Sequence, residues 1–293
     1  MSGFAEERVI SLSPFPRWKA LTEANPDKRY GGLCAEPAQI AGNAKGLKLL
    51  VWPYAPYADV RELPFVSAYY EASNAAYSEA RKLGEVCDNI PLKPALLRAG
   101  LGRYGRNALI LHETYGSRFV VQCILSRESP QFPDAEESDA LSDFCASCDL
   151  CIRACPVGAI STGGKVDLTK CLRAFDEALP VPEDKRHLLG KKLLGCDICM
   201  DACPRNRQIG RVQMPIGFAK ALSLEEILHG NVAPLGEIIG RNFARARRLQ
   251  ARACIVAANM GRRDLLPIIE GHISSDFPAL AVHAKWAKDI LKI

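Results

Sequence analysis

Residues 145–156 read CASCDLCIRACP, and residues 196–204 read CDICMDACP. The first stretch has the spacing C-x2-C-x2-C-x3-C and the second has C-x2-C-x3-C, each followed directly by proline. One further cysteine, Cys171, lies between them. Eight of the twelve cysteines therefore fall between residues 145 and 203, which predicts a metal-binding region around which this part of the chain folds.

The spacing of these thiols favours a pair of [4Fe–4S] clusters. In two-cluster ferredoxins, the cysteine that precedes proline turns away from its own group and ligates the other cluster. The same exchange here divides the eight cysteines into two sets. Cluster one would be held by Cys145, Cys148, Cys151 and Cys203, and cluster two by Cys155, Cys171, Cys196 and Cys199.

Zinc sites and disulfides are the alternatives for these cysteines. Zinc takes four ligands per site and has no use for the cross-over C-x3-C-P element. A disulfide framework is typical of small secreted domains, whereas the N-terminus MSGFAEERVISL has acidic residues where a signal peptide is basic. The remaining cysteines are expected to be packed apolar residues. They are Cys34, Cys87, Cys123 and Cys254.

The composition is that of an ordinary globular protein. A chain of 293 residues can form two or three domains. No apolar run approaches ~18 residues, so we expect no membrane span, and we expect a cytoplasmic monomer. The formal net charge is +5, and the excess is local, with eleven Lys/Arg against three Asp/Glu from Arg205 to Arg263.

Three regions are predicted from the pattern of elements. Residues 1–130 mix buried strands with helical patterns and predict an α/β layer. Residues 140–215 form the two-cluster, ferredoxin-like region. Residues 216–293 are helical throughout. The overall expectation is an α+β multidomain protein.

Within the first region, LKLLVW at 47–52 is a candidate buried strand, and residues 65–83 have apolar residues at helical spacing. The runs at 108–111 and 118–125 are rich in β-forming residues. Gly116 between them suits a tight turn, which predicts a hairpin or two adjacent strands.

In the C-terminal region, Gly, Pro and Ser-Ser-Asp breaks separate four predicted helices. The last three resemble a helical-pair repeat of the HEAT type, too short to stand alone. The helices are Phe218–His229, Arg241–Asn259, Asp264–Ile273 and Phe277–Ile290.

A glycine-rich element, RAGLGRYGRN, occupies residues 98–107. Its glycines have the Gly-x-Gly-x-x-Gly spacing of a dinucleotide fingerprint, which must follow a strand and open a helix. Here a helical pattern precedes the glycines and a strand pattern follows, so a nucleotide site is not expected. The two remaining interpretations are a backbone loop that approaches a large flat group and a tight helix-to-strand turn.

A set of arginines in the C-terminal region is spaced four, three and four residues apart, which places them on one face of the predicted helix. Such a stripe could hold tRNA phosphates, and it could equally be an ordinary solvated helix face. The stripe consists of Arg241, Arg245, Arg248 and Arg252.

Taken together, IPLKPALLRAGLGRYGRNALILHETYGSRF, the two cysteine groups and RRLQARACIVAANMGRRDLLPIIE resemble the epoxyqueuosine reductases over about residues 45–290. The resemblance implies a corrinoid-binding α/β domain, a two-cluster domain and C-terminal helical repeats. It implies cobalamin as a cofactor beside the clusters, a ferredoxin or flavodoxin as electron donor, and reduction of epoxyqueuosine in tRNA to queuosine. The chain departs from the family in a shorter N-terminal domain.

The resemblance also implies roles for particular residues. Asp88, in an Asp-x-x-Pro segment before the glycine-rich element, would be the proton donor, although its spacing from that element is shorter than in the family. Tyr104 and Arg106, beside the glycines, are alternative proton donors or phosphate-side contacts, and each could equally be an ordinary packing or surface residue. The expected cobalamin contacts are Gly102, Tyr104, Gly105, Arg106 and Asn107.

Two other functions remain compatible with the sequence. The first is a corrinoid-dependent reductase of a small molecule, for which the arginine stripe is incidental. The second is a two-cluster electron carrier without substrate chemistry of its own.

Overall fold

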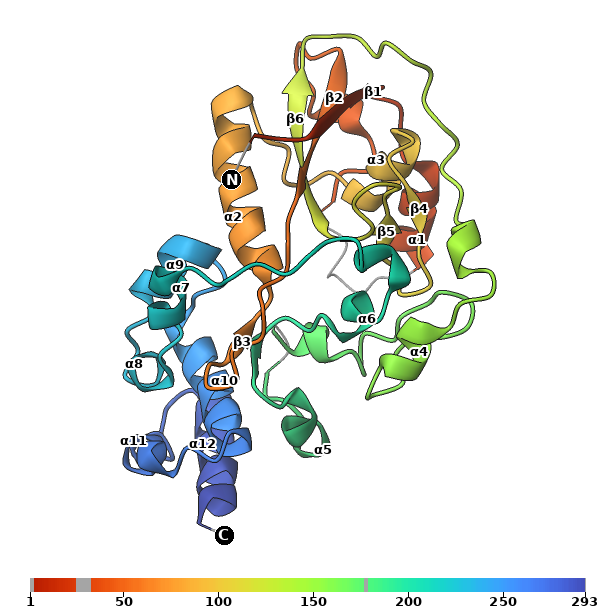
Figure 1. Ribbon diagram of the computed structural model, residues 1–293. Helices are drawn as coiled ribbons and strands as arrows, with labels where there is room; N and C mark the ends of the chain where they lie inside the picture. Colours follow the sequence, from red (N-terminus) through yellow and green to blue (C-terminus); the bar gives the residue numbers. More distant parts are fainter. Residues whose placement is uncertain (1–2, 25–32, 177–178, 293) are drawn as a thin grey trace. The chain divides into compact units, whose positions relative to one another are not determined.

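The computed structural model describes residues 3–24, 33–176 and 179–292. The chain packs into two compact units, each built from several segments (Figure 1). The first unit comprises Met1–Tyr54, Ala72–Cys148 and Pro204–Gln208, and the second comprises Ala55–Glu71, Asp149–Cys203 and Ile209–Ile293. These units interleave along the chain, so their limits differ from the predicted regions 1–130, 140–215 and 216–293. A division into three domains stays a prediction.

A three-stranded antiparallel sheet forms the centre of the first unit (Figure 1). Its order is β1 (Glu6–Ile10), β2 (Gly46–Pro53) and β6 (Phe119–Ser126). The predicted strand at 47–52 is confirmed as β2. Apart from the partly exposed Lys48, the side chains of Leu47–Trp52 are buried on both faces of the sheet, which explains the otherwise apolar sequence.

The predicted hairpin between the runs 108–111 and 118–125 is wrong. Strand β5 (Ile110–Leu111) pairs instead with β4 (Arg103–Tyr104), and β6 pairs with β2. The tight turn itself is present, because Gly116 has a φ of +52° and pairs with His112. A side chain at Gly116 would place its Cβ 2.6 Å from the carbonyl oxygen of Arg205, which explains the glycine.

The helices of the first unit cover this sheet. Helix α3 (Leu92–Arg98) packs against β6 and contributes Ala95, Leu96 and Leu97 to the core. Helix α2 (Ala68–Leu83), predicted from the spacing of its apolar residues, begins in the second unit and ends in the first. The other helical segments are α1 (Pro16–Ala24) and the 3-10 turns Pro37–Gln39, Asp143–Cys145 and Pro204–Asn206.

In the second unit, β3 (Phe65–Val66) pairs in parallel with β7 (Lys192–Leu194). This pairing explains why segment 55–71 packs with the later part of the chain. Helix α4 (Leu150–Ala154) packs against α6 (Ile198–Asp201). The remaining helical segments of this part are Leu172–Asp176, α5 (Glu183–Arg186) and His187–Leu189.

The C-terminal region is helical, as predicted, but two helix boundaries differ. The predicted helix Phe218–His229 is two helices. The first ends at Ala221, and Ser223 caps the second, because its Oγ accepts a hydrogen bond from the Glu226 N–H. The predicted helix from Arg241 begins only at Ala246. A HEAT-type repeat stays a prediction.

The C-terminal helices are α7 (Ile216–Ala221), α8 (Leu224–Leu228), α9 (Ala233–Ile239), α10 (Ala246–Asn259), α11 (Leu266–Gly271) and α12 (Pro278–Leu291), with a 3-10 turn at Arg263–Leu265. Helix α10 packs against α8 and α12 at the centre of this core. His283 of α12 is fully buried, and burial lowers its pKa to about 4. In the described ranges, no helix combines the length and the apolar character needed to cross a membrane.

Candidate functional site

The cysteines of the two motifs are all free thiols. None of the twelve cysteines, all of which lie within the described residues, forms a disulfide. Eight soft thiolate ligands suit iron–sulfur clusters, which the chain would hold through sulfur alone. The donor set therefore fits the predicted clusters.

Six of the eight cysteines belong to the second unit, where the two motifs meet. Cys151 lies on α4 and Cys199 on α6, and these two short helices pack against each other. Burial raises the pKa of the Cys196 thiol, and the neighbouring Cys171 adds to this effect. Cys171 and Cys196 are therefore close enough to interact, as two ligands of the same predicted cluster should be.

A site for a single metal ion is a separate question from a cluster site. Across residues 3–24, 33–176 and 179–292, no group of three or more His, Cys, Asp or Glu side chains is placed to hold one metal ion. The ligands of a four-iron cluster bind different iron atoms, so they need not converge on one point.

Cys145 and Cys148 belong to the first unit, where the glycine-rich element holds the loop that carries them. The backbone N–H of Arg106 lies 3.4 Å from Cys145 Sγ. The Arg106 guanidinium donates to the carbonyl oxygen of Cys148 at 3.0 Å and to that of Cys145. Just before this loop, the Ser142 N–H donates to the Tyr104 carbonyl oxygen at 2.7 Å.

The glycine-rich element is a helix-to-strand turn followed by the β4–β5 hairpin. Its glycines serve the packing of that hairpin. A Cβ on Gly102, whose φ is +146°, would lie 2.6 Å from the Leu111 carbonyl oxygen, and one on Gly105 would lie 3.0 Å from Leu111 Cγ. The element does not open a helix, so the nucleotide fingerprint is excluded on geometry.

The other predicted cobalamin contacts also have partners inside the first unit. Asn107 is buried, and its Oδ1 accepts the Leu109 N–H at 3.3 Å. Tyr104 is half-buried, and burial raises the pKa of its hydroxyl, with Asp139 and Glu137 adding to the rise. The raised pKa makes Tyr104 a weaker acid than an ordinary tyrosine.

Asp88 lies in an exposed turn between β-bridge residue Val86 and helix α3. The Tyr77 hydroxyl is 3.4 Å from Asp88 Oδ2. The preceding residue, Cys87, is buried, and its thiol forms a hydrogen bond with the thiol of Cys123, which lowers the Cys87 pKa. The prediction that these two cysteines are packed residues is confirmed, because both are buried, and they also lie in contact with each other.

The predicted arginine stripe needs correction. Arg241 and Arg245 precede α10, so the four arginines do not share one helix face, although both are exposed. Arg248 is partly exposed. Arg252 is 1% exposed, and its guanidinium donates to Asp176 Oδ1 at 3.2 Å, so it cannot contact a nucleic acid.

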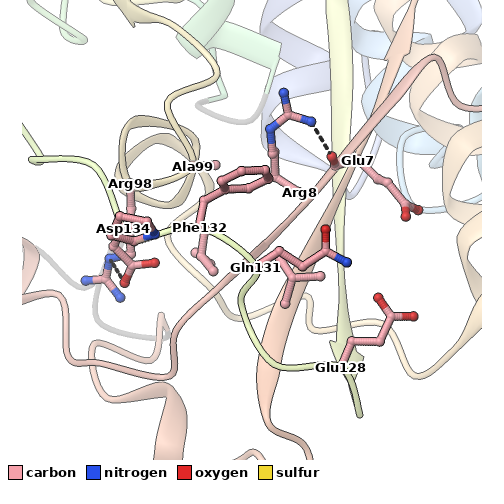
Figure 2. A pocket seen from close by; sticks show the side chains of 11 residues that line it. Glu7, Arg8, Arg98, Ala99, Glu128, Gln131, Phe132 and Asp134 are labelled. Carbon is pink, nitrogen blue, oxygen red and sulfur yellow. Dashed lines mark hydrogen bonds and ion pairs between the residues drawn. The ribbon is translucent and has the colours of Figure 1, made fainter.

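Each unit contains a pocket that the sequence did not predict. The pocket in the first unit has a volume of about 290 Å³ and is lined by β1, the end of α3 and the segment from Glu128 to Asp134. Figure 2 shows the side chains that line it, with Phe132 among charged residues such as Glu7 and Arg8.

The pocket in the second unit also has a volume of about 290 Å³, and its lining is mainly apolar. Tyr57, Phe65 and Met214 contribute to it, together with two ion pairs, Lys191–Asp59 and Arg211–Asp201. Asp197 and Ile198 also line it, and they stand between Cys196 and Cys199 in the sequence. The pocket is therefore lined by the two residues that separate Cys196 from Cys199 in the second motif.

Comparison with known proteins agrees with these features. Residues 144–206 match the family model of the 4Fe-4S double cluster binding domain. The epoxyqueuosine reductase of Staphylococcus aureus is 28% identical over 98% of this chain and 77% of its own length. Two Bacillus epoxyqueuosine reductases align over only 51% of their own length.

Solved structures extend the likeness to the whole fold. The epoxyqueuosine reductase from Streptococcus thermophilus superposes with a TM-score of 0.76 and 18% identity, covering 99% of this chain and 87% of that one. A second match, with a TM-score of 0.75, 19% identity and the same coverage, is an epoxyqueuosine reductase bound to an epoxyqueuosine-modified tRNA-Tyr stem loop. The resemblance predicted from the sequence is confirmed, and the fold is a mixed α/β fold of this type.

Proposed function

We propose that this chain is an iron–sulfur oxidoreductase of the epoxyqueuosine reductase type, which reduces epoxyqueuosine in tRNA to queuosine. The observation that carries the proposal is the set of eight cysteines at two-cluster spacing, in a chain that has the reductase fold over nearly its whole length. Its cofactors are two [4Fe–4S] clusters and cobalamin.

The clusters are assigned to the two cross-over sets of cysteines. The packing of α4 on α6 brings the two motifs together, as the cross-over requires, and the effect of Cys171 on the pKa of Cys196 supports the second set. The chain's part in electron transfer is to hold each cluster and to set its potential through hydrogen bonds, charge and solvent exposure. A ferredoxin or flavodoxin is the proposed electron donor.

Cobalamin enters the proposal through the family resemblance. A bound corrinoid would supply a reduced cobalt centre for the substrate. The geometry of the first unit does not fit the predicted contacts, because Gly102 and Gly105 pack on β5, Arg106 binds the cysteine loop and Asn107 bonds to its own hairpin. No step is therefore assigned to these residues.

The proposal is tested by anaerobic reconstitution of the full chain, followed by incubation with cobalamin, an epoxyqueuosine-containing stem loop and a reduced ferredoxin or flavodoxin that supplies the two electrons of the reduction. We expect about eight iron atoms per chain, a corrinoid spectrum on the purified protein, and conversion of the stem loop to its queuosine form. A chain that binds iron but neither binds corrinoid nor converts the stem loop would be an electron carrier, and the reductase proposal would be overturned.

Asp88 is proposed as the proton donor for the departing oxygen. Its carboxyl is exposed, so solvent protons can reach it. Replacing Asp88 with asparagine should lower turnover about 100-fold, the size of a typical general-acid contribution. The measurement is single-turnover conversion of the stem loop at matched iron and corrinoid content. Glu85→Gln, at an exposed position in the same segment, is the control, and unchanged turnover in Asp88→Asn would exclude the role.

Binding of tRNA is proposed at the exposed arginines that remain of the stripe. Reversing Arg245 and Arg248 to glutamate should weaken stem-loop binding and lower the slope of log K against log salt by about 0.7–0.9 for each phosphate that the variant no longer binds. A gel-shift titration at several salt concentrations measures both effects. The control, Lys220→Glu with Lys285→Glu, reverses two exposed charges on α7 and α12. Equal effects in the two double variants would exclude a specific site.

A small-molecule substrate is the second candidate function. The mainly apolar pocket lined by Asp197 and Ile198 favours it, because its volume of about 290 Å³ would hold a compact organic molecule. Turnover of a small epoxide or halide, with no conversion of the stem loop, would select this function.

In either case we propose a cytoplasmic monomer whose C-terminal helices form HEAT-like repeats.

A further inference from the structure

We propose that Arg106 is a positioning residue that fixes and tunes the cluster bound by Cys145 and Cys148. This inference rests on the proposed clusters and is independent of the proposed substrate. It gives the glycine-rich element a structural task in electron transfer.

Three contacts of Arg106 reach the cysteine loop. Its backbone N–H points to Cys145 Sγ at 3.4 Å, and its Nε–H donates to the Cys148 carbonyl oxygen at 3.0 Å. One terminal nitrogen donates to the Cys145 carbonyl oxygen and lies 3.5 Å from that of Ala146. One residue thus holds the backbone at both ends of the C-x2-C step and also contacts a ligand sulfur.

The hairpin behind Arg106 is built to be rigid. The Gly105 N–H donates to the Leu109 carbonyl oxygen at 2.7 Å, and Ala108 turns the chain with a φ of +58°. Lys93 of α3 donates from Nζ to the Ala108 carbonyl oxygen at 2.8 Å. These contacts close the turn that carries Arg106 and tie it to α3, so the turn can hold the guanidinium in one place.

The chemistry of arginine suits this task. Its planar fork binds two carbonyl groups at once and stays charged at all working pH values. Reduction adds negative charge to a cluster, so a nearby cation and an N–H···S hydrogen bond both stabilise the reduced form. Arg106 should therefore raise the reduction potential of the cluster that it contacts.

The test is an EPR-monitored redox titration of the full reconstituted chain, without substrate. Arg106→Gln should keep its iron and shift the midpoint potential of one cluster to a more negative value. The expected shift is about 59 mV, which corresponds to a tenfold change in the equilibrium constant of a one-electron reduction. The other midpoint should not move. Arg103→Gln, at an exposed position on the same hairpin, should leave both midpoints unchanged.

Two results would overturn the inference. The first is Arg106→Gln with full iron content and both midpoints as in the parent. If that variant loses iron, the titration is made on Arg106→Lys, which keeps the positive charge and should recover the iron with midpoints near the parental ones. The second overturning result is an Arg106→Lys chain that still loses iron, or whose midpoint for one cluster falls by about 59 mV although the charge is kept. A parent chain that takes up no clusters would instead refute the proposed cofactors, so the two failures are distinguishable.

Discussion

Replacing Cys171 with serine is expected to remove one of the two clusters and to abolish turnover. Cys171 is the ligand that stands apart in the sequence, yet its thiol interacts with that of Cys196. Its backbone N–H is fixed by the Asp167 carbonyl oxygen at 3.0 Å. A serine hydroxyl is a harder ligand that does not replace a thiolate on iron. The iron content should therefore fall from about eight to about four atoms per chain.

Iron analysis and EPR of the reduced protein measure this effect, and the spectrum should lose the signal of one cluster. Cys34→Ser is the matched control, because Cys34 is also a partly exposed free thiol and has no predicted ligand role. Its iron content and spectrum should equal those of the parent. A Cys171→Ser chain that kept about eight iron atoms would show that the cross-over assignment is wrong. Zinc in place of iron in the parent would refute the clusters themselves.

The cysteine pattern could be interpreted from the sequence because ligand spacing is local information. The C-x2-C-x2-C-x3-C-P stretch needs only a few turns of chain to place its thiols. Strand β2 was predictable for a similar reason, since Leu47–Trp52 is apolar on both faces except at Lys48. In contrast, the partner of a strand depends on the whole fold. Strand β6 pairs with β2, whereas β5, its neighbour in the sequence, pairs with β4.

The roles of single polar residues were harder to predict. Arg252 fits the spacing of an exposed stripe, and only its three-dimensional neighbours show that it is a core residue. Arg106 stands in a glycine-rich loop of the kind that binds ligands, but its hydrogen-bond partners lie some 40 residues further along the chain. Pockets such as the one lined by Asp197 and Ile198 are formed by distant segments, so no local pattern predicts them.

Replacing Asp176 with asparagine is expected to destabilise the second unit by about 3–5 kcal/mol, because it leaves the buried Arg252 without its counter-ion. Both side chains are almost fully buried, at 2% exposure for Arg252 and 4% for Asp176. Asp176 also accepts hydrogen bonds from the Tyr70 hydroxyl and from the Gly195 N–H at 2.8 Å. Burial lowers the pKa of Arg252, yet its guanidinium still makes contacts with the carbonyl oxygens of Leu193 and Phe175 at 3.4 Å.

Thermal unfolding of the reconstituted chain measures the destabilisation, which should lower the midpoint by about 10 °C. Arg173→Gln is the control, since Arg173 lies 3.1 Å from the same carboxylate but is 38% exposed. Removing that screened pair should cost about 1 kcal/mol or less. Asp176 lies only five residues after Cys171, so a loosened network should also slow iron uptake at cluster two. Equal midpoints in the two variants would mean that the Arg252–Asp176 pair does not stabilise this core.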